Sequence, residues 1–170
     1  MAPSQRALRP RRPDGGCYAI LLRLPAVRTL VTGALGAVDY PAGWYVYVGS
    51  ARGGIRARVA RHRRPAKALR WHIDYLRRVC SFVDAFAFPH PPHLSRESEI
   101  ARAVAAIADE AIPRFGASDS PDASHLFRFD HDPRTDPRFV LLCGRANNGY
   151  LLSWVLTIVP SARPLGTKMT

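Results

Sequence analysis

The sequence is poor in acidic residues and in cysteine. It holds 13 Asp and Glu against 25 Lys and Arg, a formal net charge of +12, and its pI is about 10.8. The three cysteines, Cys17, Cys80 and Cys143, lie far apart without a CxxC spacing. Neither a disulfide framework nor a zinc site is therefore indicated.

The chain also has no long hydrophobic run. Its longest apolar stretch, from Tyr150 to Val159, is too short to span a bilayer. The N-terminal residues are rich in Arg and Pro and have no apolar segment of the kind that a secretory signal needs. We therefore expect no membrane association and a cytoplasmic location.

The 170 residues suffice for one domain with a real core, and 47% hydrophobic with 22% charged residues is a globular composition. We expect a flexible basic arm at 1–15, a domain at 16–130 and an extension at 131–170. Repeated Asp-Pro steps after Asp130 suggest a linker. The apolar run beyond it is compatible with a strand or a helix.

Positive charge gathers in one segment. Between Ala51 and Cys80 basic residues recur throughout, and Asp74 is the single acidic residue. A charge run is usually a solvated face, but such a face normally mixes both signs. Uncompensated positive charge is favourable where phosphates neutralise it, so the segment indicates a polyanionic partner.

Hydrophobic patterning predicts a mixed α/β (α+β) domain, with a small antiparallel sheet flanked by helices. Helical spacing is seen in Ile55, Val59 and His62, then after Pro65 in Leu69, Ile73, Leu76 and Cys80, and at 95–111 in Ile100, Val104, Ile107 and Ala111. Apolar and aromatic runs between turn residues predict strands at 17–24, 28–32, 37–40, 44–48, 81–88 and 126–129.

Two short segments carry a family resemblance. Gly16-Cys17-Tyr18 and Tyr47-Val48-Gly49 resemble the two half-motifs of GIY-YIG nucleases, and residues 53–62 resemble the glycine turn and arginine helix of that family. The likeness is closest to the Uri-type branch and covers 16–129. Further similarities are Pro41-Ala42-Gly43, Trp71 to Leu76, Phe115 to Asp119, and Ser124 to Phe127.

The resemblance implies a metal-dependent endonuclease. Tyr18 would be the general base with Tyr47 near it, Arg58 would stabilise the phosphate, and His62 would join the site. Because a free tyrosine has a pKa near 10, we expect the basic helix and the metal to lower the pKa of Tyr18. The helical wheel supports this choice, because Arg58 and His62 flank the stripe of Ile55.

A glutamate on the third helix would hold Mg²⁺ or Mn²⁺, because such an ion often takes only one or two protein carboxylates. Glu97 and Glu99 are the two candidates for this role. Relative to Ile100, Glu97 lies near the inward face and Glu99 points outward. We therefore expect Glu97 to bind the metal, although a first-turn glutamate can also serve only the helix dipole.

The remaining basic side chains are expected to bind nucleic acid, with DNA as the expected substrate: Arg52, Arg56, Arg61, Arg63, Arg64, Lys67, Arg70 and His72. Arg61 in particular should face solvent or distant phosphates. Alternatively Tyr18 and Tyr47 are only strand aromatics, and His62 and His72 hydrogen-bonded core histidines.

Two other functions stay open. A non-catalytic nucleic-acid-binding module would need only the basic residues, Arg77 among them. A docking partner for an endonuclease III-like repair enzyme follows from the fusions seen in the Uri-type branch. The sequence leaves the oligomeric state open.

Overall fold

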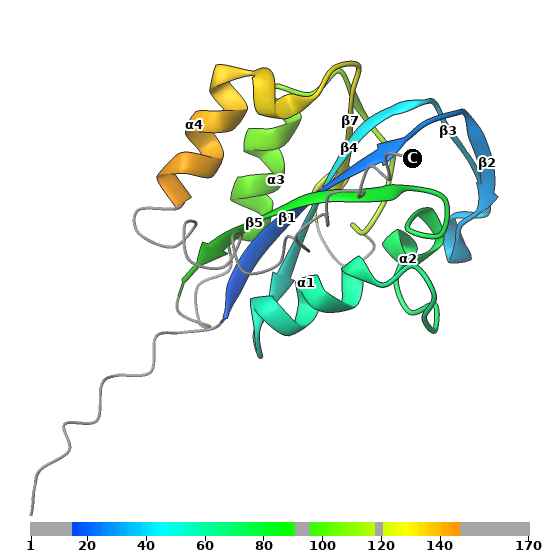
Figure 1. Cartoon of the computed structure of the whole chain (residues 1–170), viewed down its shortest axis with the longest axis horizontal. Coiled ribbons are helices and arrows are strands. Elements are labelled where there is room, and N and C mark those ends of the chain that lie inside the picture. Colours follow the sequence, from blue (N-terminus) through cyan, green and yellow to red (C-terminus); the bar gives the residue numbers. More distant parts are fainter. Residues whose placement is uncertain (1–14, 91–95, 118–120, 147–170) are drawn as a thin grey trace, which may run out of the picture.

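The structure, a computed structural model, describes residues 15–90, 96–117 and 121–146 (Figure 1). Several predictions lie outside the described residues. They are the basic arm up to residue 14, the start of the third helix at 95, the end of the Phe115 to Asp119 similarity, and the apolar run within 147–170.

A five-stranded antiparallel sheet forms the centre of the fold (Figure 1). Its order is β5 (Ser81–Pro89), β1 (Gly16–Leu24), β4 (Gly43–Ala51), β7 (Leu126–Phe129) and β6 (Glu110–Ala111). The two half-motif segments are direct neighbours, because β1 pairs with β4 along its whole length. The predicted mixed α and β class with a small antiparallel sheet is confirmed.

A separate two-stranded ribbon extends from the side of this sheet. It consists of β2 (Arg28–Val31) and β3 (Ala37–Tyr40), joined by the short 3-10 helix η1 (Gly33–Leu35). A buried hydrogen bond of 2.9 Å between the hydroxyls of Thr32 and Tyr40 links the turn of the ribbon to the far end of β3. The predicted strand pair is thus present.

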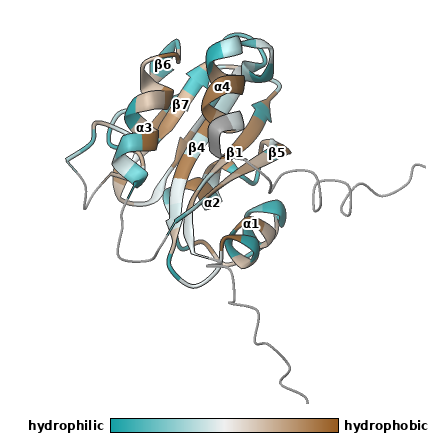
Figure 2. Ribbon diagram, turned by 90° about the vertical axis from the view of Figure 1, so that its left-hand side faces the viewer, coloured by the Kyte–Doolittle hydropathy of each residue, from teal (hydrophilic) through white to brown (hydrophobic). Residues whose placement is uncertain are grey.

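Helices cover both faces of the sheet (Figures 1 and 2). One face carries α1 (Ile55–Arg63) and α2 (His72–Leu76). The other carries α3 (Glu97–Ala105) and α4 (Pro137–Ala146), with the 3-10 helix η2 (Pro133–Thr135) leading into α4. The fold has three layers.

Alternation along β1 divides the buried residues into two cores. Tyr18 and Ile20 pack towards α1 and α2. Ala19 and Leu21 pack towards α3 and α4. Because successive strand residues point to opposite faces, each strand of the half-motifs serves both cores at once.

Two predicted helices are shorter in the structure. The second was expected to include Leu69, but α2 has five residues and Leu69 is 38% exposed. The backbone is still extended at Trp71 (φ −128, ψ 156), so α2 begins only at His72. The third helix ends at Ala105, and Ala111 lies exposed in β6 rather than inward on a helix.

The domain continues past Asp130, where we expected it to end. Phe139 and Cys143 of α4 are 1% and 5% exposed and belong to the second core. The ring centroid of Phe139 lies 5.3 Å from that of Phe86 on β5. The boundary at 130 is therefore wrong, and residues through α4 belong to the domain.

Among the described residues, no helix combines the length and the apolar character that crossing a bilayer requires.

Candidate active site

The two half-motifs meet at a tyrosine and a glycine. Tyr18 on β1 stands opposite Gly49 on β4. A Cβ atom at Gly49 would lie 2.5 Å from the hydroxyl oxygen of Tyr18, closer than real contacts allow. The glycine of the second segment is therefore what lets the tyrosine of the first lie flat across β4.

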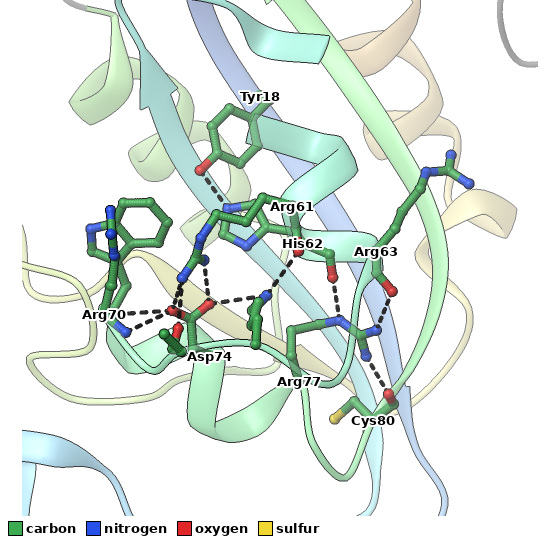
Figure 3. Close-up of polar contacts among 11 residues, drawn as sticks. Tyr18, Arg61, His62, Arg63, Arg70, Asp74, Arg77 and Cys80 are labelled. Carbon is green, nitrogen blue, oxygen red and sulfur yellow. Dashed lines mark hydrogen bonds and ion pairs between the residues drawn. The ribbon is translucent and has the colours of Figure 1, made fainter. Parts of the chain in front are cut away.

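The Tyr18 hydroxyl reaches the first helix. It lies 2.9 Å from Nε2 of His62 on α1, as Figure 3 shows. Tyr18 is 2% exposed and His62 is fully buried. The ring centroid of Tyr47 lies 6.5 Å from that of Tyr18 and 6.0 Å from that of His62. The structure thus brings these three predicted site residues together.

Burial decides the protonation of this pair. It raises the pKa of Tyr18 well above 10, an effect that Tyr47 and Glu97 add to and Arg58 opposes. Burial also lowers the pKa of His62 to about 3, helped by the charge of Lys67. Arg58 on the basic helix lowers the pKa of Tyr18, as expected, but desolvation of the phenolate outweighs the nearby guanidinium and the net shift is upward.

Both rings are therefore neutral at pH 7, and one hydrogen bond joins the Tyr18 hydroxyl to His62 Nε2. In the tautomer that carries its ring hydrogen on Nδ1, Nε2 accepts from Tyr18. Nδ1 is buried and finds no hydrogen-bond partner within the part of the chain that the structure describes. A buried ring nitrogen without a partner is uncommon in a purely structural histidine.

Arg58 is held beside this pair. Its guanidinium carbon lies 4.4 Å from the ring centroid of Trp71, and its charge acts on both Tyr18 and His62. The side chain is half-buried. A cation stacked on an indole keeps its charge while losing conformational freedom, so Arg58 is available to an anion at the site.

Of the two competing glutamates, Glu97 is the less exposed. Its carboxylate is 23% exposed and raises the pKa of Tyr18 through its negative charge. Glu99 is 62% exposed and forms an ion pair with Arg96 in the first turn of α3. The helical-wheel choice of Glu97 over Glu99 as the inward residue therefore agrees with the geometry.

A buried carboxylate that sequence analysis noted only as the single acid of its segment holds α1 in place. Asp74 is fully buried and accepts from Arg61 Nη1 and Nη2 at 2.7 and 2.8 Å (Figure 3). Lys67 Nζ lies 3.0 Å from the same carboxylate. The expectation that Arg61 faces solvent is wrong, and both cations are engaged in an internal ion pair rather than free for phosphates.

Arg77 caps the same C-terminal end of α1. It is 3% exposed and donates to the carbonyl oxygens of His62 at 2.7 Å, Arg63 at 3.1 Å, and Cys80 (Figure 3). These carbonyls belong to or follow helix ends, which lack internal partners. Arg77 therefore caps α1, and counting it among surface cations was wrong.

His72 has a structural environment. Its Nδ1 accepts from the backbone N–H of Gly116 at 3.3 Å, and its ring packs edge-on against Phe115. Burial lowers the pKa of His72, so the ring is neutral at pH 7. This geometry favours the core alternative over a contact with nucleic acid.

The other basic candidates remain at the surface. Arg63 is half-buried with its guanidinium over the Phe82 ring. The exposed ones are Arg52, Arg56, Arg64 and Arg70. These arginines flank α1 and the segment after it, on the same side of the sheet as Tyr18 and His62.

Comparison with protein families gives one match. The family described as Domain of unknown function DUF123 matches residues 17–145, from β1 through α4. The chain belongs to the DUF123 family. Neither the curated proteins nor the solved structures contain a match. The family region reaches α4, in agreement with the core that Phe139 completes.

A further histidine of this DUF123 domain adjoins the site. His125, directly before β7, is 4% exposed, and its Nδ1 lies 3.5 Å from Oε1 of Glu97. Sequence reasoning quoted it within the Ser124 to Phe127 similarity without giving it a role. Its position in a short loop carried no periodicity that could have marked it.

The described residues were compared with the ligand sets that hold metal ions. No group of three or more His, Cys, Asp or Glu arranged to hold a metal occurs in 15–90, 96–117 and 121–146. A partly exposed Glu97 suits a hard ion that keeps most of its water, such as Mg²⁺ or Mn²⁺.

Proposed function

We propose that this DUF123 domain is a metal-dependent endonuclease that hydrolyses phosphodiester bonds, with DNA as the substrate. The observation that carries the proposal is the buried Tyr18–His62 hydrogen bond, which Tyr47 and Arg58 surround. The negative charge of Glu97 also contributes to the raised pKa of Tyr18. The resemblance of the two half-motifs to GIY-YIG nucleases adds independent support.

The chain's own residues would divide the chemistry. The Tyr18 oxygen accepts a proton from the attacking water while its own hydroxyl proton passes to His62 Nε2, 2.9 Å away. Negative charge on a bound phosphate favours this transfer, because it stabilises the imidazolium that forms. Arg58 holds the non-bridging oxygens of the phosphate.

Glu97 is the residue that would hold Mg²⁺ or Mn²⁺, and the ion would supply positive charge to the phosphate and the leaving oxygen. The exposed arginines around α1 would bind neighbouring phosphates and fix the register of the strand without reading bases. We further propose a cytoplasmic site of action and cooperation with an endonuclease III-like repair enzyme.

One observation favours a second function, a nucleic-acid-binding module without catalysis. Tyr18 is 2% exposed, so in this structure its hydroxyl has little access to a substrate. Binding through the exposed arginines would not require that access. The two functions differ in whether products form.

The deciding experiment is incubation of the purified protein with labelled plasmid, single-stranded DNA and RNA, with and without Mg²⁺. We expect Mg²⁺-dependent nicking that falls by about 10² to 10⁴-fold in Tyr18→Phe, because a general base contributes that much. Glu97→Ala should also lose cleavage. Both variants should still bind DNA.

Matched controls separate chemistry from folding. Tyr45 is a fully buried tyrosine on the same strand as Tyr47, and its hydroxyl donates to the Pro41 carbonyl at 2.6 Å. Tyr45→Phe removes that hydroxyl. Glu99→Ala removes the exposed neighbour of Glu97. Both should keep cleaving. Cleavage that survives Tyr18→Phe and Glu97→Ala removes the nuclease assignment, and salt-sensitive binding without products establishes the binding module instead.

A further inference from the structure

The backbone of His125 is tied to the strand that carries the second half-motif. Its carbonyl accepts from the N–H of Val48 at 2.9 Å, and its own N–H donates to the carbonyl of Phe115 at 2.8 Å. Val48 stands between Tyr47 and Gly49. The position of His125 is therefore fixed relative to the tyrosines of the site.

The imidazole of His125 lies between two carboxylates. Nδ1 is 3.5 Å from Oε1 of Glu97, and Nε2 is 3.2 Å from Oδ2 of Asp122. The Nδ1 contact is an ion-pair distance without hydrogen-bond geometry, and Nδ1 is buried with no better partner among the described residues. The one polar atom of His125 that lacks a hydrogen bond thus points at Glu97.

The far side of the ring is anchored to the same helix. Asp122 is almost fully buried and lies 3.1 Å from Nε of Arg102. Arg102 and Glu97 both belong to α3. The chain of contacts from Arg102 through Asp122 and His125 returns to Glu97, so the loop before β7 and the first turns of α3 form one closed arrangement.

Gly116 packs closely against the side chains of His125 and Tyr47. Gly116 has a φ of +68, and a Cβ there would lie 3.4 Å from Cβ of His125 and 3.3 Å from the ring of Tyr47. Glycine adopts this backbone without strain. The same residue therefore leaves room for His125 and Tyr47 side by side.

We infer that His125 is a positioning residue that orients the carboxylate of Glu97 for divalent-metal binding. This inference rests on the proposed function. His125 faces Oε1, which leaves Oε2 as the oxygen for the ion. Partners that hold a metal-binding carboxylate typically change metal affinity or activity by about 10 to 100-fold when they are removed.

Two amide variants distinguish the two ring nitrogens. The side-chain nitrogen of asparagine can take the place of Nδ1, and that of glutamine the place of Nε2. His125→Asn thus keeps a donor near Glu97 and loses the Asp122 contact, whereas His125→Gln does the reverse. His131→Gln, at an exposed histidine beyond the other end of β7, is the matched control.

The measurement is titration of the full-length protein with Mn²⁺, with free ion followed by electron paramagnetic resonance, alongside thermal unfolding of each variant. We expect His125→Gln to weaken Mn²⁺ binding by about 10-fold or more. His125→Asn and His131→Gln should stay close to wild type. Cleavage assays at saturating Mn²⁺ should show His125→Gln partly restored.

Other outcomes overturn the inference. Equal affinity in wild type and His125→Gln shows that Nδ1 does not act on the metal. Equal loss in both amide variants, or loss in His125→Asn alone, assigns the effect to packing or to Asp122. If the wild-type protein neither binds Mn²⁺ nor cleaves DNA, the proposed function itself is refuted. The wild-type measurement alone therefore separates failure of the proposed function from failure of the inference about His125.

Discussion

Replacing Asp74 by asparagine tests whether the buried ion pair fixes α1. The carboxylate accepts two hydrogen bonds from Arg61, one from the Arg70 N–H at 2.9 Å and one from the Trp71 N–H at 3.2 Å, and it pairs with Lys67. Asp74→Asn preserves the shape, removes the charge and replaces one accepting oxygen by a donor. Two cations then face an amide.

The expected loss of stability is large for a change of one atom. Removing one partner from a buried ion pair costs about 3 to 5 kcal/mol. Arg61 retains 19% exposure and Lys67 8%, so solvent relieves part of the imbalance. We therefore expect a loss of about 3 kcal/mol, the low end of that range, which is a sizeable share of the roughly 5 to 15 kcal/mol typical of a domain.

The effect must also depend on pH. Burial alone would raise the pKa of Asp74, but the hydrogen bonds from Arg61, Arg70, Lys67 and Trp71 lower it well below 3.8. The unfolded chain therefore takes up the proton at higher pH than the folded protein does. The stabilisation is complete above about pH 4 and is lost as the pH falls through the folded pKa.

Urea unfolding followed by circular dichroism at pH 7 and in acid measures both effects. The difference between wild type and Asp74→Asn should be largest at neutral pH and shrink in acid. Asp130→Asn breaks an exposed pair with Arg128 and should cost at most about 1 kcal/mol. Equal midpoints for wild type and Asp74→Asn at pH 7, or a difference that grows in acid, would refute the reasoning.

Gly49→Ala should destabilise the fold by about 1 to 3 kcal/mol and reduce cleavage, because the new methyl group displaces Tyr18. The control Gly53→Ala should do neither, because a Cβ there meets no atom within 4 Å. Equal melting temperatures for the two variants would contradict this. Arg77→Lys should lower the melting temperature measured by circular dichroism, since each buried carbonyl left unpaired costs about 1 to 3 kcal/mol, and an unchanged value would remove its capping role. A thiol reagent at pH 8 should leave the native protein unmodified until denaturant is added, because burial raises the thiol pKa values to about 11, 12 and 12 for Cys17, Cys80 and Cys143. Rapid reaction of the folded protein would show that a thiol is accessible.

Patterns of short range predicted much of the fold. The strands at 37–40 and 126–129 have the expected bounds, and the period of Ile55 and Val59 identified α1. Helical geometry also supported Arg58 and His62, which the family resemblance implied, and it selected Glu97 over Glu99. Each of these inferences needs only the local chain direction.

Interactions between distant segments were not predictable in this way. The positive charge between Ala51 and Cys80 suggested arginines available to phosphates. In the structure, Asp74 binds Arg61 thirteen residues away, and Arg77 donates to a carbonyl at the end of α1. The pKa of Tyr18 depends on how completely α1 covers it. Helix α4 was missed as part of the domain because Phe139 finds its partners on strands far along the chain.

The placement of α4 bears on how the protein should be produced. A fragment ended at Asp130 would retain every residue of the two half-motifs, the arginine helix and Glu97. It would also uncover Phe86 and Phe129, which pack against Phe139 in the core between the sheet and helices α3 and α4. Such a fragment would misrepresent the activity of the intact chain, and truncations are best made beyond residue 146.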